Sequence, residues 1–222
     1  MTPTRRLAAI AAACIVAMTV SCVSSTHDSV APGSSEASPK PEFTQVTSSM
    51  FVDQSAAPNS AATEFTAPSI ENLTPGSREP VDPPECAPIF WGPNSTQVGS
   101  VSWSTTIAAD MSSIDQLKVF NLFLSVPVER PDFVSTLGKC GTVTYQGVAT
   151  KASLLHLRGV PNWATATRII SQGADGAGII GLCRGLFVSV AFTQKPGGDL
   201  SPDDTNALVK LFNDQVAKLE AI

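Results

Sequence analysis

An alternation of apolar and hydroxyl side chains constrains the fold of this chain more than any other feature of its sequence. In residues 100–107, SVSWSTTI, the side chains of Val101, Trp103 and Ile107 alternate with small hydroxyl side chains. A period of two residues is that of a β-strand with one buried side and one side in solvent. Residues 120–126 repeat the pattern and predict a second strand of the same kind.

The second half of the chain carries further strand signals. Strands are predicted at 141–147, 151–159 and 186–192, of which the last has the clearest alternation. Residues 168–171 and 178–182 flank the dipeptide Asp175-Gly176, which is a typical hairpin turn. We therefore expect a hairpin there.

The C-terminus is predicted to be a helix that begins after Ser201. Ser201 is a good N-cap, Pro202 suits the first helical position, and Asp203 and Asp204 complement the positive end of the helix dipole. Apolar residues then follow at steps of three and four, which makes one face apolar: Leu208, Leu211, Phe212, Val216 and Leu219. A shorter helix is predicted at 131–137. This order of elements predicts an α+β fold, a twisted antiparallel sheet with helices packed on one face.

The N-terminus has the layout of a secretory signal. Arg5 and Arg6 precede an apolar run at 7–20, which is shorter than the roughly 20 residues of a permanent membrane-spanning helix. The stretch Thr19-Val20-Ser21-Cys22 resembles a bacterial lipobox, with Thr19 where leucine is usual. We predict that residues 1–21 are a cleaved signal peptide and that Cys22 receives lipid. The alternative is an ordinary cleaved signal that happens to contain a cysteine.

The rest of the chain divides by composition. Residues 22–42 are predicted to be the lipidated cysteine and a disordered tether, because serine, proline and alanine there offer little to bury. Residues 43–79 form an irregular lead-in interrupted by prolines, and residues 80–222 form the folded domain. Lipid on Cys22 would attach this domain to the outer face of the cell membrane.

Charge excludes one class of partner. The full chain has a formal net charge of −5. Removing residues 1–21 takes away two arginines and no acid, so the mature chain is more acidic still. Phosphate binding needs a basic face, so nucleic acid is not an expected partner. The expected partners are the membrane, through the N-terminal lipid, and an unidentified ligand or protein of the cell envelope.

The sequence offers few motifs that would indicate a catalytic site. The glycines of GADGAG at 173–178 precede a strand, whereas a dinucleotide-binding loop must open a helix. No GxSxG motif is present, and no Cys/His spacing suits zinc. His156, the lone histidine of 80–222, lies in an apolar segment and is interpreted as a core or sheet residue. We therefore expect no catalytic residue, metal or cofactor, and no enzyme activity.

Three aromatic residues are candidates for a ligand cleft or an interface. Phe90 and Trp91 lie between two prolines, and Trp163 follows Pro161-Asn162. Aromatic side chains on loops beside prolines line clefts and interfaces. The alternative is that they plug the ends of the sheet.

The C-terminal third resembles a known family. The run CRGLFVSVAF at 183–192 and the helix after it resemble the end of the extracellular sensor domain of mycobacterial PknH-type receptor kinases, a domain shared by free-standing mycobacterial lipoproteins. Pro84-Glu85-Cys86 is similar to the start of that domain, and Leu137-Gly138-Lys139-Cys140 to its middle cysteine. The resemblance covers residues 80–222 and implies a disulfide-stapled α+β domain with a cleft for an unidentified ligand.

Three cysteines remain in the predicted domain, and export favours a disulfide between two of them. Cys140 begins one predicted strand and Cys183 begins another, so we predict a Cys140–Cys183 bridge. Cys86 is then left as a buried inert thiol, as an alternative partner of either cysteine, or as a reactive or intermolecular thiol.

Two functions from different classes follow from the sequence. The first is a cell-envelope lipoprotein that serves as an extracytoplasmic binding or sensor-like module for a small or lipidic ligand. The alternative is a protein-interaction or structural envelope lipoprotein without a ligand. The first is favoured by the resemblance, which is an analogy of fold.

Overall fold

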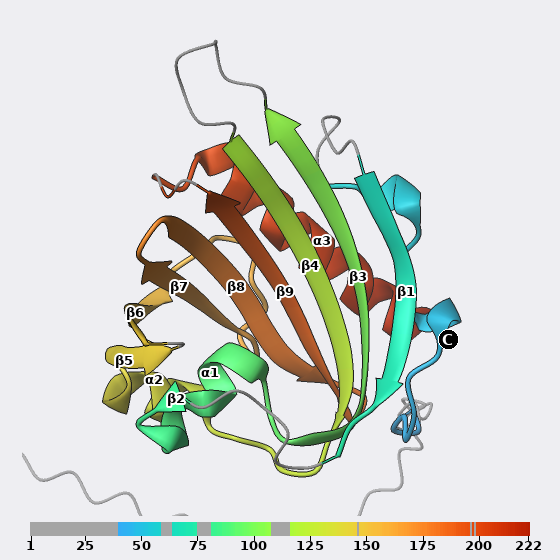
Figure 1. Ribbon diagram of the computed structural model, residues 1–222. Coiled ribbons are helices and arrows are strands. Elements are labelled where there is room, and N and C mark those ends of the chain that lie inside the picture. The colour runs from blue at the N-terminus through green and yellow to red at the C-terminus, as the bar shows by residue number, and fades with distance from the viewer. Residues whose placement is uncertain are drawn as a thin grey trace, which may run out of the picture. The chain divides into compact units, whose positions relative to one another are not determined.

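A nine-stranded antiparallel sheet lies at the centre of the structure (Figure 1). The computed structural model describes residues 40–58, 64–74, 81–107, 116–145, 147–195, 197 and 199–222. Within them the strand order is β1-β3-β4-β9-β8-β7-β6-β5-β2. The strands are β1 (Glu64–Asn72), β2 (Val81–Asp82), β3 (Ser95–Ile107), β4 (Gln116–Pro127), β5 (Thr142–Tyr145), β6 (Val148–Leu155), β7 (Thr165–Ser171), β8 (Ala174–Cys183) and β9 (Leu186–Lys195).

The strands predicted from alternation are confirmed and pair with one another. In the β3–β4 ladder Trp103 lies opposite Phe120, and in the β4–β9 ladder Phe120 lies opposite Phe192. All three side chains therefore point to the same face of the sheet, and each is 3% exposed or less. The hydroxyl side chains between them face the other way.

The predicted β7–β8 hairpin is present, but its turn is not at Asp175-Gly176. Gln172 and Gly173 make the turn, while Asp175 and Gly176 lie inside β8, opposite Ile170 and Ile169. Gly173 has a φ of +75°, so the positive dihedral that a tight turn needs is placed on this glycine.

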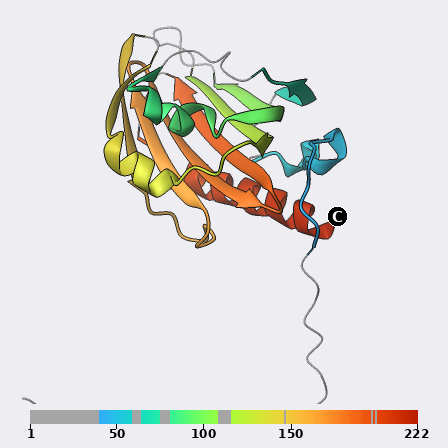
Figure 2. The same cartoon turned by 90° about the horizontal axis from the view of Figure 1, so that it is seen from below.

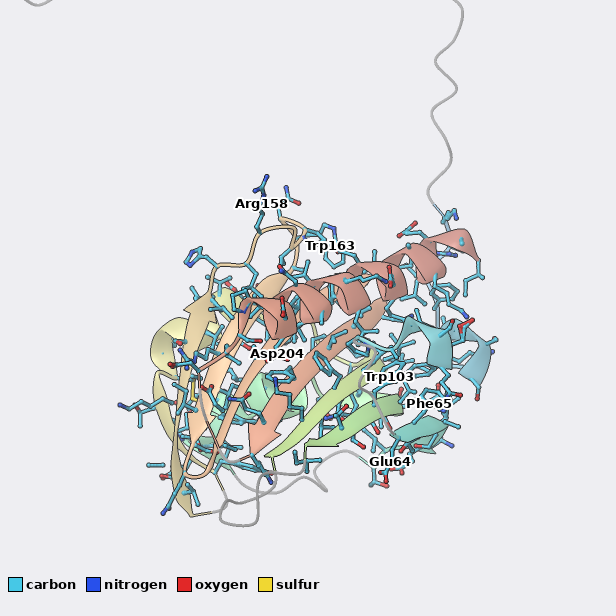
Figure 3. All side chains as sticks on the ribbon, turned by 90° about the horizontal axis from the view of Figure 1, so that it is seen from above. Glu64, Phe65, Trp103, Arg158, Trp163 and Asp204 are labelled. Atoms are coloured by element: carbon cyan, nitrogen blue, oxygen red, sulfur yellow. A yellow bond between two sulfur atoms is a disulfide. The ribbon has the colours of Figure 1, made fainter. Side chains whose placement is uncertain are left out.

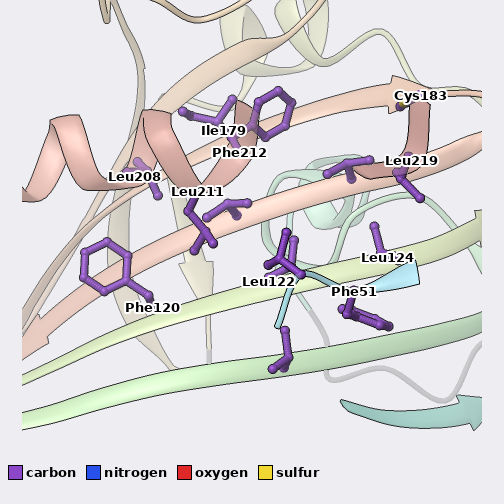
Figure 4. Close-up of a cluster of buried hydrophobic side chains, with 14 of the residues drawn as sticks. Phe51, Phe120, Leu122, Leu124, Ile179, Cys183, Leu208, Leu211, Phe212 and Leu219 are labelled. Atoms are coloured by element: carbon purple, nitrogen blue, oxygen red, sulfur yellow. The ribbon is translucent and has the colours of Figure 1, made fainter. Parts of the chain in front are cut away.

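The long C-terminal helix α3 (Pro202–Ala221) covers one face of the sheet, as predicted. The Ser201 hydroxyl accepts a hydrogen bond from the Asp204 backbone N–H at 3.1 Å, which caps the helix. The Asp204 carboxylate, buried at the first turn, forms an ion pair of 2.8 Å with Lys118 of β4. The apolar side of α3 packs on β4, β8 and β9 to form the main core (Figure 4), which includes Leu122, Ile179, Val190, Leu208, Leu211, Phe212 and Leu219.

Two short helices lie against the opposite face, whereas the sequence predicted helices on one face. They are α1 (Ala87–Trp91), which follows the 3-10 turn η3 (Pro84–Cys86), and α2 (Phe133–Lys139). Phe133 of α2 stacks on Phe187 of β9, a side chain that points away from α3 because its neighbours in the strand face α3. Figure 2 shows α1 and α3 on opposite faces of the sheet. The α+β class, the antiparallel sheet and the C-terminal helix are confirmed.

The described residues of the segment 43–79, which the sequence predicts to be an irregular lead-in, form regular elements and pack on the sheet. The 3-10 turns η1 (Ser48–Met50) and η2 (Gln54–Ala56) and strand β1 come from it. Val46 and Phe51 are buried against β3 at Gly99, where a Cβ would lie 2.9 and 2.8 Å from them. Phe65 of β1 packs on Trp103, with ring centroids 5.6 Å apart (Figure 3).

The signal peptide predicted at 1–21, Cys22 and the tether up to residue 39 lie outside the described residues. Within the part of the chain that the structure describes, no helix is long and apolar enough to cross a membrane.

The disulfide joins Cys86 to Cys140, with 5.7 Å between their Cα atoms, so the predicted Cys140–Cys183 bridge is wrong. Cys140 ends α2 beside β5, and Cys183 ends β8. Strands β6 and β7 lie between β5 and β8, so the two cysteines are not on neighbouring strands as the prediction required. Cys183 is a free, buried thiol.

Candidate ligand cavity

A cavity of about 530 Å³ lies on the face of the sheet opposite α3. Its floor is made by β4, β9, β8 and β7, and α1 with Tyr145 of β5 bounds it on the other side. Its volume falls in the range of about 300–1,000 Å³ that is typical of small-molecule sites.

Small residues on two adjacent strands create this cavity. Gly176 and Gly178 of β8 lie opposite Thr193 and Ala191 of β9, and all four line it. A Cβ on Gly178 would be 3.5 Å from both Thr167 Oγ1 and the Val190 carbonyl oxygen, which is ordinary contact. A larger side chain at position 178 would therefore fit on the backbone and occupy the space above the floor.

Aromatic side chains form much of the wall. Phe90 of α1 stacks on Tyr145, with ring centroids 5.5 Å apart and planes at 21°. Phe187 lies under Gly92, which has a φ of +71° and a Cβ position only 2.6 Å from the Phe187 ring. Only glycine satisfies both conditions, so it brings the end of α1 close to the sheet.

The disulfide holds in place α1, which forms part of this wall. Cys86 immediately precedes α1, and its bond to Cys140 ties α1 to α2 and the β5 edge. Both cysteines are buried in a small second core with Val81, Ile89, Leu137, Val143 and Ala152.

The polar groups that reach the cavity are mostly hydroxyls. Thr167 of β7 and Ser189 and Thr193 of β9 line it, and no side-chain hydrogen bond joins these three to any other described residue. The Ser125 hydroxyl, by contrast, accepts a hydrogen bond from the Ser95 hydroxyl at 3.0 Å.

Charge is nearly absent from the lining. Among the described lining residues Asp175 and Lys195 are charged. Asp175 alternates with the cavity-facing Ala174 and Gly176, so its carboxylate points to the α3 face, where Arg168 binds it at 2.6 Å. That hydrogen bond raises the pKa of Arg168 above its usual value. Lys195 is exposed at the end of β9, so the cavity itself is suited to a neutral, largely apolar ligand.

Of the three aromatic candidates, the structure places only one in the cavity. Phe90 lines it. The backbone of Trp91 ends α1, but its side chain lies outside what the structure describes. Trp163 lies on the α3 face, over Gly181 and 5.8 Å from the Phe212 ring, and is 45% exposed (Figure 3). It covers the edge of the main core.

The floor of the cavity was not predicted. The signal for it was the run of small residues at every second position of β8, where glycines at 176 and 178 share one face. The sequence pattern predicts Gly176 in a turn and Gly178 in the segment after it, so it does not show that both glycines lie on one face of the same strand.

A shallower depression of about 370 Å³ lies beyond the end of β6, lined by His156, Arg158 and Asn162 among others. His156 is exposed there and lies just after the end of β6, so its interpretation as a core or sheet residue is wrong. The described residues contain no group of three His, Cys, Asp or Glu side chains that could hold a metal ion.

Cys183 is the remaining nucleophile candidate, and its surroundings make it inert. It is 4% exposed beneath the end of α3 (Figure 4), and its S–H donates to Glu220 Oε1 at 3.4 Å. Burial, with this hydrogen bond, raises the pKa of Cys183 to about 12. Reactive cysteines need the opposite shift.

Comparison with known proteins shows a similarity of fold. No family model matches the chain, and no curated protein sequence matches it. Among solved structures, the extracellular domain of PknH from Mycobacterium tuberculosis is similar in fold, with a TM-score of 0.51 and 12% sequence identity. The match covers 82% of this chain and 99% of that domain. At this level of identity the similarity concerns the fold alone, and it agrees with the resemblance stated from the sequence.

Proposed function

We propose that this chain is an exported, lipid-anchored binding module of sensor-like fold, without enzyme activity, whose cavity takes a neutral and largely apolar ligand of the cell envelope. The observation that carries the proposal is the cavity of about 530 Å³ between α1 and the sheet. It combines an aromatic wall, a floor of small residues and a few hydroxyl groups, which is the usual composition of a ligand site.

Two features support the location. The N-terminus has the layout of a secretory signal that ends in a lipobox-like cysteine. The disulfide between Cys86 and Cys140 is of the kind that persists outside the reducing cytosol. The PknH domain similar in fold is by its description extracellular, which agrees with both.

The test is to ask what the folded protein carries from its cell. Residues 1–22 are replaced by a signal that ordinary signal peptidase removes, so the protein is secreted by an actinobacterial host without its own lipid. The purified protein is then analysed by native mass spectrometry, and its organic extract by mass spectrometry. We expect a reproducible added mass that is lost on denaturation.

A matched pair of variants assigns the ligand to the cavity. Gly178→Leu fills the floor, whereas Gly141→Leu adds the same side chain at an exposed glycine with no atom within 4 Å of its Cβ position. The first variant should lose the added mass and the second should keep it. A clean apo mass for the unmodified sequence would contradict the proposal and favour the interaction role.

A further inference from the structure

The cavity is one half of an amphipathic sheet face. Each residue on this face has partners directly opposite it on the neighbouring strands, so the face divides into cross-strand rows. The row through Gly178 runs Thr66, Ser102, Asn121, Ala191, Gly178, Thr167 from β1 to β7. Its first three members are polar, and the next two are the small residues that line the cavity.

The rows on either side also change from polar residues on β1 and β3 to more apolar residues on β8 and β7. One begins with Ser69 and Ser100 and continues through Phe123 and Ser189 to Ile180. The other begins with Glu64 and Ser104 and continues through Val119, Thr193 and Gly176 to Ile169. Polar side chains thus cluster on β1 and β3, and the apolar lining lies on β8 and β7.

We define the polar patch as the residues Thr66, Ser100, Ser102 and Asn121. The Ser100 hydroxyl is 3.4 Å from that of Ser69, but no side-chain hydrogen bond joins Thr66, Ser102 or Asn121 to another described residue. These three side chains are half-buried or exposed. Their donors and acceptors are therefore directed at the space above the sheet rather than at the protein.

The patch is continuous with the cavity and carries no charge of its own. Asn121 lies directly opposite Ala191, and Ser100 opposite Phe123; Ala191 and Phe123 both line the cavity. On the same face, Glu64 and Glu71 of β1 lie one row to either side of the patch, and Lys195 lies two rows from Asn121. An anionic head group on the patch would therefore find no counter-charge there, whereas hydroxyl and amide side chains both donate to and accept from other hydroxyls.

From this juxtaposition we infer the class of ligand: a neutral amphiphile with an alkyl chain in the cavity and a polyhydroxylated, sugar-like head group on the polar patch. The inference rests on the proposed function and adds the chemistry of the head group to it. The alkyl chain of the ligand is held by burial of apolar surface, which does not distinguish one head group from another. The head group is selected by hydrogen bonds to the side chains of Ser102, Asn121 and their neighbours.

The test uses probes that have the same alkyl chain and different head groups. The secreted protein that begins at residue 23 is titrated calorimetrically, below each critical micelle concentration, with dodecyl maltoside, dodecyl octaethylene glycol ether, dodecylphosphocholine and dodecyl sulfate. We expect the maltoside to bind about tenfold more tightly than the ether, which corresponds to one or two net hydrogen bonds. The two charged-head probes should bind no better than the ether.

Variants separate the two halves of the site. The double variant Ser102→Ala/Asn121→Ala should weaken maltoside binding about tenfold and leave ether binding unchanged. Gly178→Leu should weaken the binding of both probes. If that variant does not fold, Ala191→Leu is used in its place and should have the same effect. Ser153→Ala, on an exposed residue whose partner Arg168 faces α3, is the control and should change neither.

The outcomes distinguish this inference from the proposed function. Equal binding of all head groups, with loss in Gly178→Leu, would overturn the head-group assignment and leave the cavity as a site for an apolar chain. A preference for the phosphocholine or sulfate head would also overturn it. No binding of any probe, together with an apo mass for the secreted protein, would overturn both.

Discussion

The side-chain amide of Gln215, fully buried in α3, donates a hydrogen bond to the backbone carbonyl of Met50 at 2.8 Å. Its amide oxygen accepts from the Val52 N–H at 3.0 Å. One side chain thus satisfies two backbone groups of a segment more than 160 residues away along the chain. Since buried polar groups are costly without partners, Gln215 joins the N-terminal segment to the last helix.

Gln215→Leu should therefore destabilise the fold although it keeps the size of the side chain. The substitution leaves the Met50 carbonyl and the Val52 N–H unsatisfied, and we expect a loss of about 2–4 kcal/mol in the free energy of unfolding. Denaturant unfolding followed by circular dichroism measures it. On the same helix, Lys210→Ala breaks an exposed ion pair with Asp214 and should cost less than about 0.5 kcal/mol. Equal stability of Gln215→Leu and the unmodified protein would show that the N-terminal segment does not depend on this side chain.

The disulfide pairing can be checked without a structure. Peptide mapping of the unreduced protein should yield a linked pair that contains Cys86 and Cys140, and an unlinked peptide with Cys183. A linked Cys140–Cys183 peptide would contradict the structure. The bond closes a loop with a sequence separation of 54. On the chain-entropy model, its loss in Cys86→Ser/Cys140→Ser should lower the free energy of unfolding by about 4 kcal/mol at most.

Cys183 should be unreactive in the folded protein. With its pKa raised to about 12, the thiol remains protonated at neutral pH, and burial keeps reagents away from it. The rate of reaction with Ellman's reagent at pH 8 should be at least a hundredfold below that of an engineered cysteine at the exposed position Ser153. In denaturant the two rates should converge. Comparable rates in the folded state would mean that the end of α3 opens readily.

The same shift has a consequence for stability against pH. The Cys183 thiol has a higher pKa in the folded than in the unfolded state. As pH rises, the unfolded chain therefore loses this proton before the folded protein does, and the unfolded state is favoured. The stability of the unmodified protein relative to Cys183→Ala should thus fall above about pH 9, the ordinary value, and continue to fall toward pH 12. Unfolding both proteins at pH 7, 9 and 10 measures this difference. A difference that does not change with pH would contradict the shift.

The proposed lipid attachment can be tested at Cys22, which lies outside the described part of the chain. Cys22→Ala should remove the acyl chains, so the N-terminal peptide loses their mass and the protein no longer partitions into the detergent phase of Triton X-114. Cys14→Ala, inside the predicted signal, is the control and should leave both unchanged. If the N-terminal peptides of the Cys22→Ala and unmodified proteins differ only by the mass of the substitution itself, no acyl chain was attached and the signal is an ordinary one.

Much of the secondary structure was predictable because its signals are local. The alternation that placed β3, β4 and β9 needs only neighbouring residues, and so does the cap of α3 at Ser201. The β7–β8 hairpin was also predicted, although its turn was placed at Asp175-Gly176 instead of Gln172–Gly173. Both dipeptides end in glycine, and local propensity does not reveal that Asp175 pairs with Arg168 across the ladder.

The cavity, the disulfide and the start of the folded unit depend on contacts between distant segments. Phe90, which lines the cavity, was among the candidates because an aromatic residue beside prolines is a local signal. The floor at Gly178 becomes a site only when β9 lies beside β8 and α1 folds back over both.

By itself, the sequence determined the α+β class, the antiparallel strands and the C-terminal helix, because each depends on the period or spacing of adjacent residues. Only the tertiary structure decided that Cys86 pairs with Cys140, that residues 40–58 complete the core, and that small residues on two strands leave a cavity beside a polar patch. Each of these depends on strand order and register, which are set by the burial of many side chains at once.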